Sequence, residues 1–204
     1  MIEMVDTDIS IETLSECLLP EHELDIEIKK NLEDLGEKFI LLVVERSPQS
    51  GMLTLQLIKH FFEECGTGAC VSINKPVEDL LKGLEIKCID SKKLIFVDCV
   101  SKMAGMKEMG EKNFIYVDSP KQLLELSEAV DAAMAMLVGK NFFVMLDSLS
   151  TLLVYNEEKA VEKFFHTTVT KMRTLNVKGI FLVTQEKKHV IQTLSQFADR
   201  TIYL

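Results

Sequence analysis

Residues 39–57 place a turn suited to holding a phosphate group between a hydrophobic segment and an amphipathic one. The hydrophobic segment, residues 39–44, has the length and composition of a buried strand. The turn contains Pro48, Ser50 and Gly51, and the apolar spacing after it is that of a helix. Backbone N–H groups at the start of a helix attract anions. The first chemistry that the sequence indicates is therefore the binding of an anionic group by a loop.

The same turn lacks the side chains with which nucleotide-hydrolysing loops act. Such loops follow the Walker A pattern G-x-x-x-x-G-K-[ST], whose lysine reaches the β- and γ-phosphates and whose hydroxyl holds Mg²⁺. Gly51 keeps the second glycine, and Arg46 stands at the first. Met52 replaces the lysine, Leu53 replaces the hydroxyl residue, and Thr54 follows one place late. The turn predicts a degenerate nucleotide-binding loop formed by Ser47, Pro48, Gln49, Ser50, Gly51, Met52, Leu53 and Thr54.

A second candidate lies in residues 141–155, which read NFFVMLDSLSTLLVY. An apolar strand that ends in Asp147 is typical of a Walker B segment, in which the carboxylate holds Mg²⁺. Aspartate is also a favoured N-cap, so Asp147 could instead cap the helix that follows. The sequence leaves both roles open.

From residue 38 onward, apolar segments of strand length alternate with segments of helical spacing. This alternation predicts a mostly parallel sheet with helices on both faces. Ligands bind such sheets at the carboxyl ends of the strands, where the loop, Asp98, Asp147 and Thr184 are expected to share one rim. The expected strands are 39–44, 69–73, 94–98, 114–117, 142–147, 179–184 and 201–204, and the expected helices are 53–65, 77–81, 120–138, 157–175 and 189–197.

An extension precedes this alternating region. Apolar spacing predicts a short helix over residues 11–18 that stops near Pro20, and a second helix over residues 23–35 that ends at Gly36. The expected organisation is an N-terminal helical extension, residues 1–37, and one α/β domain, residues 38–204. The extension is expected to pack on the edge of the domain or on a partner.

Five segments along the chain carry a resemblance to a known family. In order they are VSINKP (71–76), FVD (96–98), DSLS (147–150), VTQE (183–186) and ADRTI (198–202). Together with the loop, this series resembles RecA-like P-loop ATPases of the KaiC branch over residues 38–204. The resemblance implies a three-layer α/β RecA-like P-loop domain, with Asp147 as the Walker B carboxylate and Thr184 as a sensor-like residue.

The departures from that family matter as much as the likeness. Asn74 and Lys75 stand where the family has the paired glutamates that activate the attacking water, and neither accepts a proton as a carboxylate does. With the loop lysine and the Mg²⁺ hydroxyl also missing, no catalytic residue is assigned. The expectation is a pseudo-ATPase with a regulatory or scaffolding role that binds ATP or ADP weakly at most. Asp147 would be a metal ligand only if Mg-nucleotide binds.

Two alternatives stay open. The chain could be an active ATPase in which another lysine reaches the phosphates; Lys75 is better placed for this than Lys59, which lies about 12 Å along the helix from the loop. It could also be a sensor of a different small ligand, because Met52 and Leu53 would give an apolar floor that favours a less charged molecule.

Composition narrows the functional classes. The 204 residues carry a net charge of −9 without a basic stripe, so direct nucleic-acid binding is disfavoured and a protein partner or self-association is expected. No apolar run approaches the roughly 18 residues of a membrane span, and the acidic N-terminus is unlike a secretory signal. Five cysteines without metal-ligand spacing indicate reduced thiols in the cytoplasm. As a stand-alone domain, the chain resembles those abundant in archaea.

Overall fold

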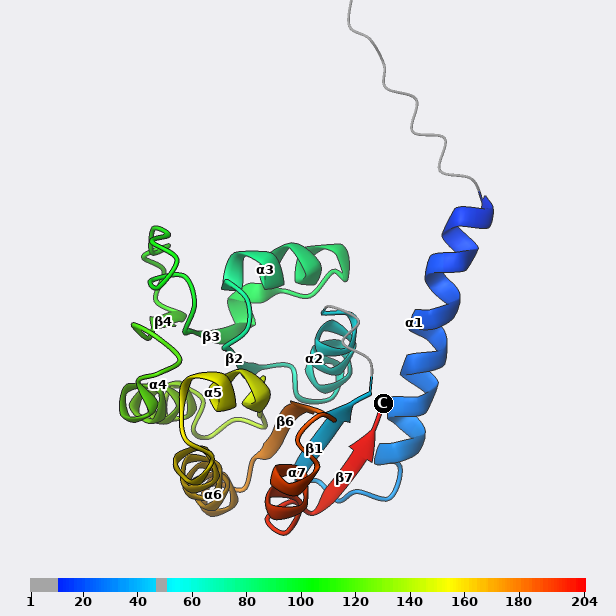
Figure 1. The fold of residues 1–204 in the computed structure, drawn as a ribbon. Coiled ribbons are helices and arrows are strands. Elements are labelled where there is room, and N and C mark those ends of the chain that lie inside the picture. Colours follow the sequence, from blue (N-terminus) through cyan, green and yellow to red (C-terminus); the bar gives the residue numbers. More distant parts are fainter. Residues whose placement is uncertain (1–10, 47–50) are drawn as a thin grey trace, which may run out of the picture.

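The computed structural model describes residues 11–46 and 51–204, with side chains from residue 21 onward. The described residues form a seven-stranded sheet in which all neighbouring strands are parallel, with the order β4-β3-β2-β5-β6-β1-β7 (Figure 1). This confirms the predicted α/β class. The strands are β1 (Ile40–Glu45), β2 (Gly68–Ser72), β3 (Leu94–Asp98), β4 (Phe114–Tyr116), β5 (Phe143–Asp147), β6 (Lys178–Thr184) and β7 (Arg200–Tyr203).

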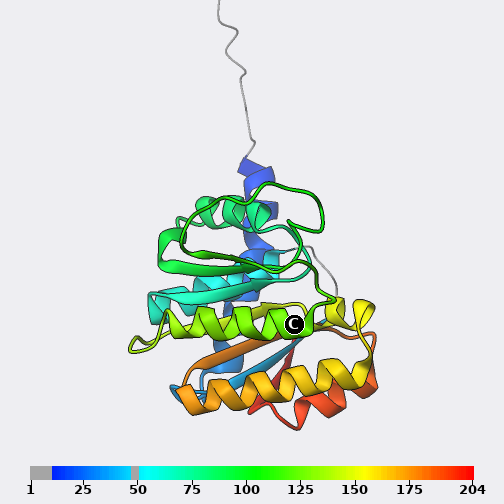
Figure 2. The same ribbon diagram turned by 90° about the vertical axis from the view of Figure 1, so that its left-hand side faces the viewer.

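Helices cover both faces of this sheet, which gives the three layers expected. One hydrophobic core lies between the sheet and the first three helices, and the other lies between the sheet and the last four. In Figure 2, α4 and α6 lie across the second face. The helices are α1 (Ile11–Leu32), α2 (Met52–Cys65), α3 (Val77–Ile86), the short 3₁₀ helix η1 (Ser91–Lys93), α4 (Leu123–Ala135), α5 (Leu149–Tyr155), α6 (Glu158–Leu175) and α7 (Lys188–Ser195).

The strands are apolar throughout because both of their faces are buried. Along β1, Leu42 and Val44 pack into one core, while Leu41 and Val43 pack into the other. The apolar runs of the sequence therefore correspond to the strands with end points that differ by a residue or two. Gly66 ends α2 as predicted, in the left-handed conformation with a φ of 76° that glycine adopts without strain.

The N-terminal extension differs from the prediction of two short helices. A single 22-residue helix, α1, runs through Pro20 and projects past the rest of the domain at its N-terminal end (Figure 1). An interior proline removes one backbone hydrogen bond and usually kinks or breaks a helix, which was the reason for the predicted stop, but α1 continues through Pro20. Ile28 is fully buried against the core beside α2, and the Gln56 side-chain amide donates to the Glu21 carbonyl oxygen at 3.2 Å. The C-terminal half of α1 is thus part of the packed structure.

Three other helix assignments were wrong. Residues 149–155 form α5, which the sequence analysis did not assign. The helix expected from Pro120 begins at Leu123, because residues 120–122 form a turn whose Pro120 carbonyl oxygen accepts a hydrogen bond from Asn156. Helix α3 runs on to Ile86, five residues beyond the predicted end at Leu81.

Candidate functional site

The candidate residues that end different strands lie along the carboxyl edge of the sheet. Ser72, the last residue of β2, is in register with Asp98 of β3 on one side and with Asp147 of β5 on the other. Farther along the edge, Glu45 of β1 is in register with Thr184 of β6. The sheet order therefore brings together residues from separate parts of the chain, as expected for an α/β sheet of this kind.

The predicted loop is described only in part, since Ser47, Pro48, Gln49 and Ser50 lie outside the described residues. Gly51 is the N-cap of α2 and has a φ of 83°, a conformation that favours glycine. Met52 is half-buried and borders a cavity, whereas Leu53 points into the core. The apolar floor expected from both residues is therefore wrong for Leu53, because successive helical side chains point about 100° apart.

Thr54 and Asp147 are joined directly. The Thr54 hydroxyl donates to Oδ2 of Asp147 at 2.9 Å. Burial raises the pKa of Asp147, and the Thr54 hydrogen bond and the positive charge of Lys75 act against that rise. The N-cap of α5 is Ser148, so the interpretation of Asp147 as the cap of that helix is wrong. The peptide bond between Asp147 and Ser148 is cis.

Lys75 lies beside the loop. Its Nζ is 3.4 Å from the position that a Cβ on Gly51 would occupy. Within the described part of the chain, this ammonium group makes no hydrogen bond and has no carboxylate oxygen within 4.0 Å. Lys59, the other candidate, is on the surface, where its Nζ is 4.0 Å from Glu63. Of the two lysines considered from the sequence, only Lys75 reaches the loop.

Glu45 belongs to the same group of charges, although the sequence analysis did not single it out. Burial raises the pKa of Glu45, the charge of Asp147 raises it further, and the charge of Lys75 lowers it. Its position as the last residue of β1 was the signal available in the sequence. Two carboxyl groups at this edge therefore share one nearby cation.

The raised pKa of Glu45 leads to a prediction about pH. Between the ordinary glutamate pKa of 4.5 and its raised value, the folded state binds more protons than the unfolded chain, so the contribution of Glu45 to stability falls as pH rises through this window. We expect Glu45→Gln to raise the melting temperature at about pH 8 and to raise it less at about pH 4. Thermal unfolding followed by circular dichroism at both pH values measures this.

The matched control for that prediction is Glu85→Gln, on the exposed side of α3. It should leave the melting temperature unchanged at both pH values. An equal gain for Glu45→Gln at both pH values would contradict the assigned role of burial.

A cavity of about 310 Å³ opens at this group of residues and extends between α2, α3 and the sheet. Its inner polar end is formed by Thr54, Ser72, Lys75 and Asp147. Its apolar part was missed by the sequence analysis because it depends on how the helices pack. That part is formed by Met52, Leu55, Cys70, Val71, Leu80 and Met145.

Thr184, the sensor-like candidate, is held by α5 and does not line the cavity. Its backbone N–H donates to Ser150 Oγ at 2.8 Å, and the two hydroxyl oxygens are 3.0 Å apart. Arg46, which stands at the position of the first Walker A glycine, is exposed and lies over the ring of Tyr203 at 6.0 Å. Neither side chain reaches the polar end of the cavity.

Asp98 is buried and organises the backbone around it. Its carboxylate accepts hydrogen bonds from the backbone N–H groups of Val77, Val100 and Ser101 and from the Ser101 hydroxyl, at 2.7–3.0 Å. The bond to Val77 fixes the start of α3, two residues after Lys75. The Asp98 carboxylate accepts all four of these hydrogen bonds from groups of the protein itself. Asp98 is therefore a structural residue at the carboxyl edge of the sheet.

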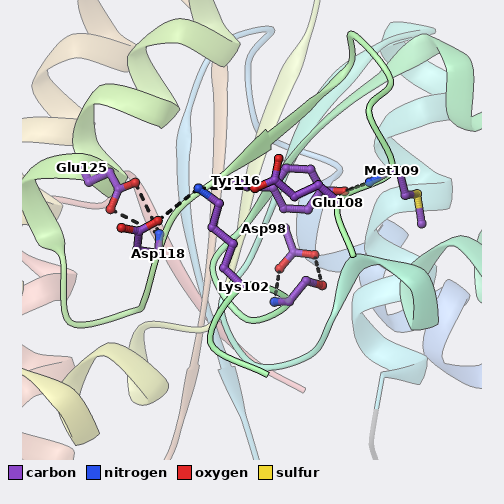
Figure 3. A network of polar contacts seen from close by, with 8 residues as sticks. Asp98, Lys102, Glu108, Met109, Tyr116, Asp118 and Glu125 are labelled. Carbon is purple, nitrogen blue, oxygen red and sulfur yellow. Dashed lines mark hydrogen bonds and ion pairs between the residues drawn. The ribbon is translucent and has the colours of Figure 1, made fainter. Parts of the chain in front are cut away.

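The methionine-rich segment after Asp98 is folded back by a polar network (Figure 3). Lys102 pairs with Asp118 at 3.0 Å and with Glu108 at 3.5 Å, and the Met109 N–H donates to the Tyr116 hydroxyl at 2.9 Å. The exposed ion pairs contribute little stability each. Met103 nevertheless remains largely exposed.

Neither a cluster of metal-binding side chains nor a membrane-spanning helix is present in the described residues. Among them, no group of three or more His, Cys, Asp or Glu side chains is arranged to hold a metal ion. Burial raises the pKa of the Cys70 and Cys99 thiols, whereas Cys88 is exposed. None of the described helices has the length and apolarity needed to cross a bilayer.

Comparisons with solved structures agree with this architecture. An uncharacterized protein from Pyrococcus horikoshii, PH0321, crystallised with an unknown peptide, has a TM-score of 0.64 at 14% identity, covering 87% of this chain and 82% of its own. The KaiC-like protein PH0186 of the same organism has a TM-score of 0.54 at 17% identity, with coverage of 84% and 77%. The flagellar accessory protein FlaH from Methanocaldococcus jannaschii has a TM-score of 0.55 at 16% identity, with coverage of 87% and 76%.

The chain has the RecA-like α/β fold of KaiC-like proteins. This class is defined by these structural similarities together with the sheet order and the loop after β1. The chain belongs to a family of unknown function (DUF7504), whose model matches residues 75–204. A comparison with curated proteins found no match. At these identities the solved structures establish the fold, and the function has to be argued from the site.

Proposed function

We propose that this protein is a RecA-like domain that does not hydrolyse nucleotides and acts as a regulatory or scaffolding protein in the cytoplasm. The observation that carries the proposal is the position of Lys75, whose Nζ lies beside Gly51 on an edge where Asp147 and Glu45 are its neighbouring carboxyl groups. A tethered ammonium group supplies the positive charge that Mg²⁺ supplies at a hydrolytic site.

The groups needed for hydrolysis are replaced by others. Met52 cannot neutralise phosphate charge, and Leu53 is buried in the core instead of offering a hydroxyl to a metal. Asn74 is exposed at the position of the expected general base. Stabilisation of the charge on transferring phosphate is worth several orders of magnitude in rate, so these replacements together favour a domain without turnover.

A role through protein contacts is supported by the surface and by the neighbours. The net charge of −9 disfavours direct nucleic-acid binding. One structural neighbour was crystallised with a peptide, and another is a flagellar accessory protein. We infer that this chain also works through a protein partner or through self-association, which sedimentation velocity over a range of concentrations tests.

The central test is turnover of Mg-ATP by the purified protein. We expect no phosphate release above the buffer background, and Asp147→Ala should give the same rate as the wild type. Calorimetric titration with Mg-ATP alongside should give weak binding at most. Turnover that disappears in Asp147→Ala would contradict the proposal.

A second candidate, nucleotide binding through a displaced lysine, rests on the same 3.4 Å approach of Lys75 to Gly51. In that case Lys75→Leu abolishes nucleotide binding, whereas Lys59→Leu, which alters a surface lysine on α2, preserves it. If Lys75 serves only as a counter-ion for the carboxyl groups, both variants show the same weak binding as the wild type.

A further inference from the structure

The cavity beside Lys75 combines one polar end with a continuous apolar surface. Cys70 and Met145 form a floor that is almost completely buried, and Leu55 of α2 and Leu80 of α3 form the walls. Helix α3 approaches α2 closely, since a Cβ on Gly83 would lie 2.5 Å from a methyl carbon of Leu55. The cavity is therefore bounded by packed elements and is at the small end of the range for small-molecule sites.

The charged groups near the mouth of the cavity form ion pairs, whereas at its inner end Lys75 has Asp147 and Glu45 as neighbouring carboxyl groups without a hydrogen bond to either. Near the mouth, Lys87 pairs with Glu21 at 3.1 Å, and Asp79 pairs with Lys82 at 3.1 Å. At the inner end, one oxygen of Asp147 already accepts the Thr54 hydrogen bond. An ammonium group has three donors and no acceptor, and the Lys75 Nζ uses none of them on the described residues.

We propose that this cavity binds a small amphiphilic molecule with a single anionic group, of the kind represented by a medium-chain carboxylate. The anionic group accepts hydrogen bonds from Lys75, and the hydrocarbon chain lies on Met145 between Leu55 and Leu80. The inference deepens the proposed function and rests on it, because the domain then responds to this ligand in place of a hydrolysed nucleotide.

Chain length and charge give a quantitative expectation. Burial of one methylene is worth a factor of about four in affinity, so octanoate, with two more methylenes, should bind roughly 15-fold more tightly than hexanoate as long as the cavity accommodates the longer chain. Octylamine carries the opposite charge and 1-octanol carries none. Both should bind more weakly than octanoate, since neither offers an anion to Lys75.

The test is a titration of the full chain with octanoate, followed by NMR of its methionine methyl groups. Met52 and Met145 line the cavity, whereas Met103 and Met136 are exposed elsewhere. We expect saturable shifts of Met52 and Met145 only. An absence of shifts at Met145 up to the solubility limit of octanoate, or equal shifts with octylamine, would overturn the inference.

Variants separate specific binding from a general effect of detergent-like molecules. Lys75→Leu should weaken octanoate binding at least tenfold, and Leu80→Trp should block the cavity, with folding of each checked by circular dichroism. Lys59→Leu, a change at a surface lysine of α2 that does not line the cavity, should bind as the wild type does. Unchanged binding in Lys75→Leu would also overturn the inference.

The two proposals fail in distinguishable ways. If the protein does not hydrolyse Mg-ATP and its Met145 methyl does not respond to octanoate, the proposed ligand is wrong and the proposal of a domain without turnover is unaffected. A protein that hydrolyses Mg-ATP through Asp147 would refute the proposed function, whatever the response to octanoate.

Discussion

Replacing Asp98 with alanine should lower the free energy of unfolding by about 3–4 kcal/mol. The substitution leaves three backbone N–H groups and one hydroxyl without the carboxylate that now accepts from them. Each buried donor left unsatisfied costs about 1–3 kcal/mol, and water entering the space offsets part of the sum. Urea unfolding followed by circular dichroism measures the change.

Two variants isolate the cause. Asp98→Asn keeps one acceptor oxygen and should lose distinctly less stability than Asp98→Ala. Asp118→Ala removes a carboxylate of the exposed network in Figure 3 and should cost at most about 1 kcal/mol. Similar losses for Asp98→Ala and Asp118→Ala would show that burial of the hydrogen-bonded carboxylate is not the source of the effect.

The second large effect is expected at α1. Ile28 is fully buried in the core between the first three helices and the sheet, and truncation of a buried isoleucine to alanine costs about 2–5 kcal/mol. We expect Ile28→Ala to lie in that range in the same unfolding experiment. This result would show that α1 unfolds together with the α/β domain. The domain boundary predicted at residue 37 would then be wrong.

The control lies in the same helix. Ile26 has 53% of its surface exposed, so Ile26→Ala should change the free energy of unfolding by no more than about 0.5 kcal/mol. If Ile28→Ala were equally mild, α1 would lie outside the cooperative fold, and the boundary predicted at residue 37 would stand.

The sheet was predictable because its strands are buried on both faces. A strand such as β1 or β5 then reads as an unbroken apolar run, and a polar residue such as Asp147 marks its carboxyl end. The missed helix α5 had a signal as well, since Leu149, Leu152 and Leu153 follow helical spacing and all three are buried.

The site was less predictable because it depends on which strands are neighbours. Lys75 follows β2, and it lies near Asp147 only because β2 pairs with β5 and not with β1. No local feature of the sequence indicates that β2 pairs with β5. The cavity depends in addition on the distance between α2 and α3, which close packing at Gly83 and Leu55 sets.

The position of β1 in the sheet has a consequence for biosynthesis. Among the strands that the structure describes, β1 pairs with β6 and β7 alone, whose residues begin at Lys178, more than a hundred positions later in the chain. The segment ILLVVE thus leaves the ribosome well before either partner strand exists. Such non-local parallel pairing forms slowly and exposes apolar surface meanwhile. The nascent chain should therefore need shielding by a chaperone until its last strand has been made.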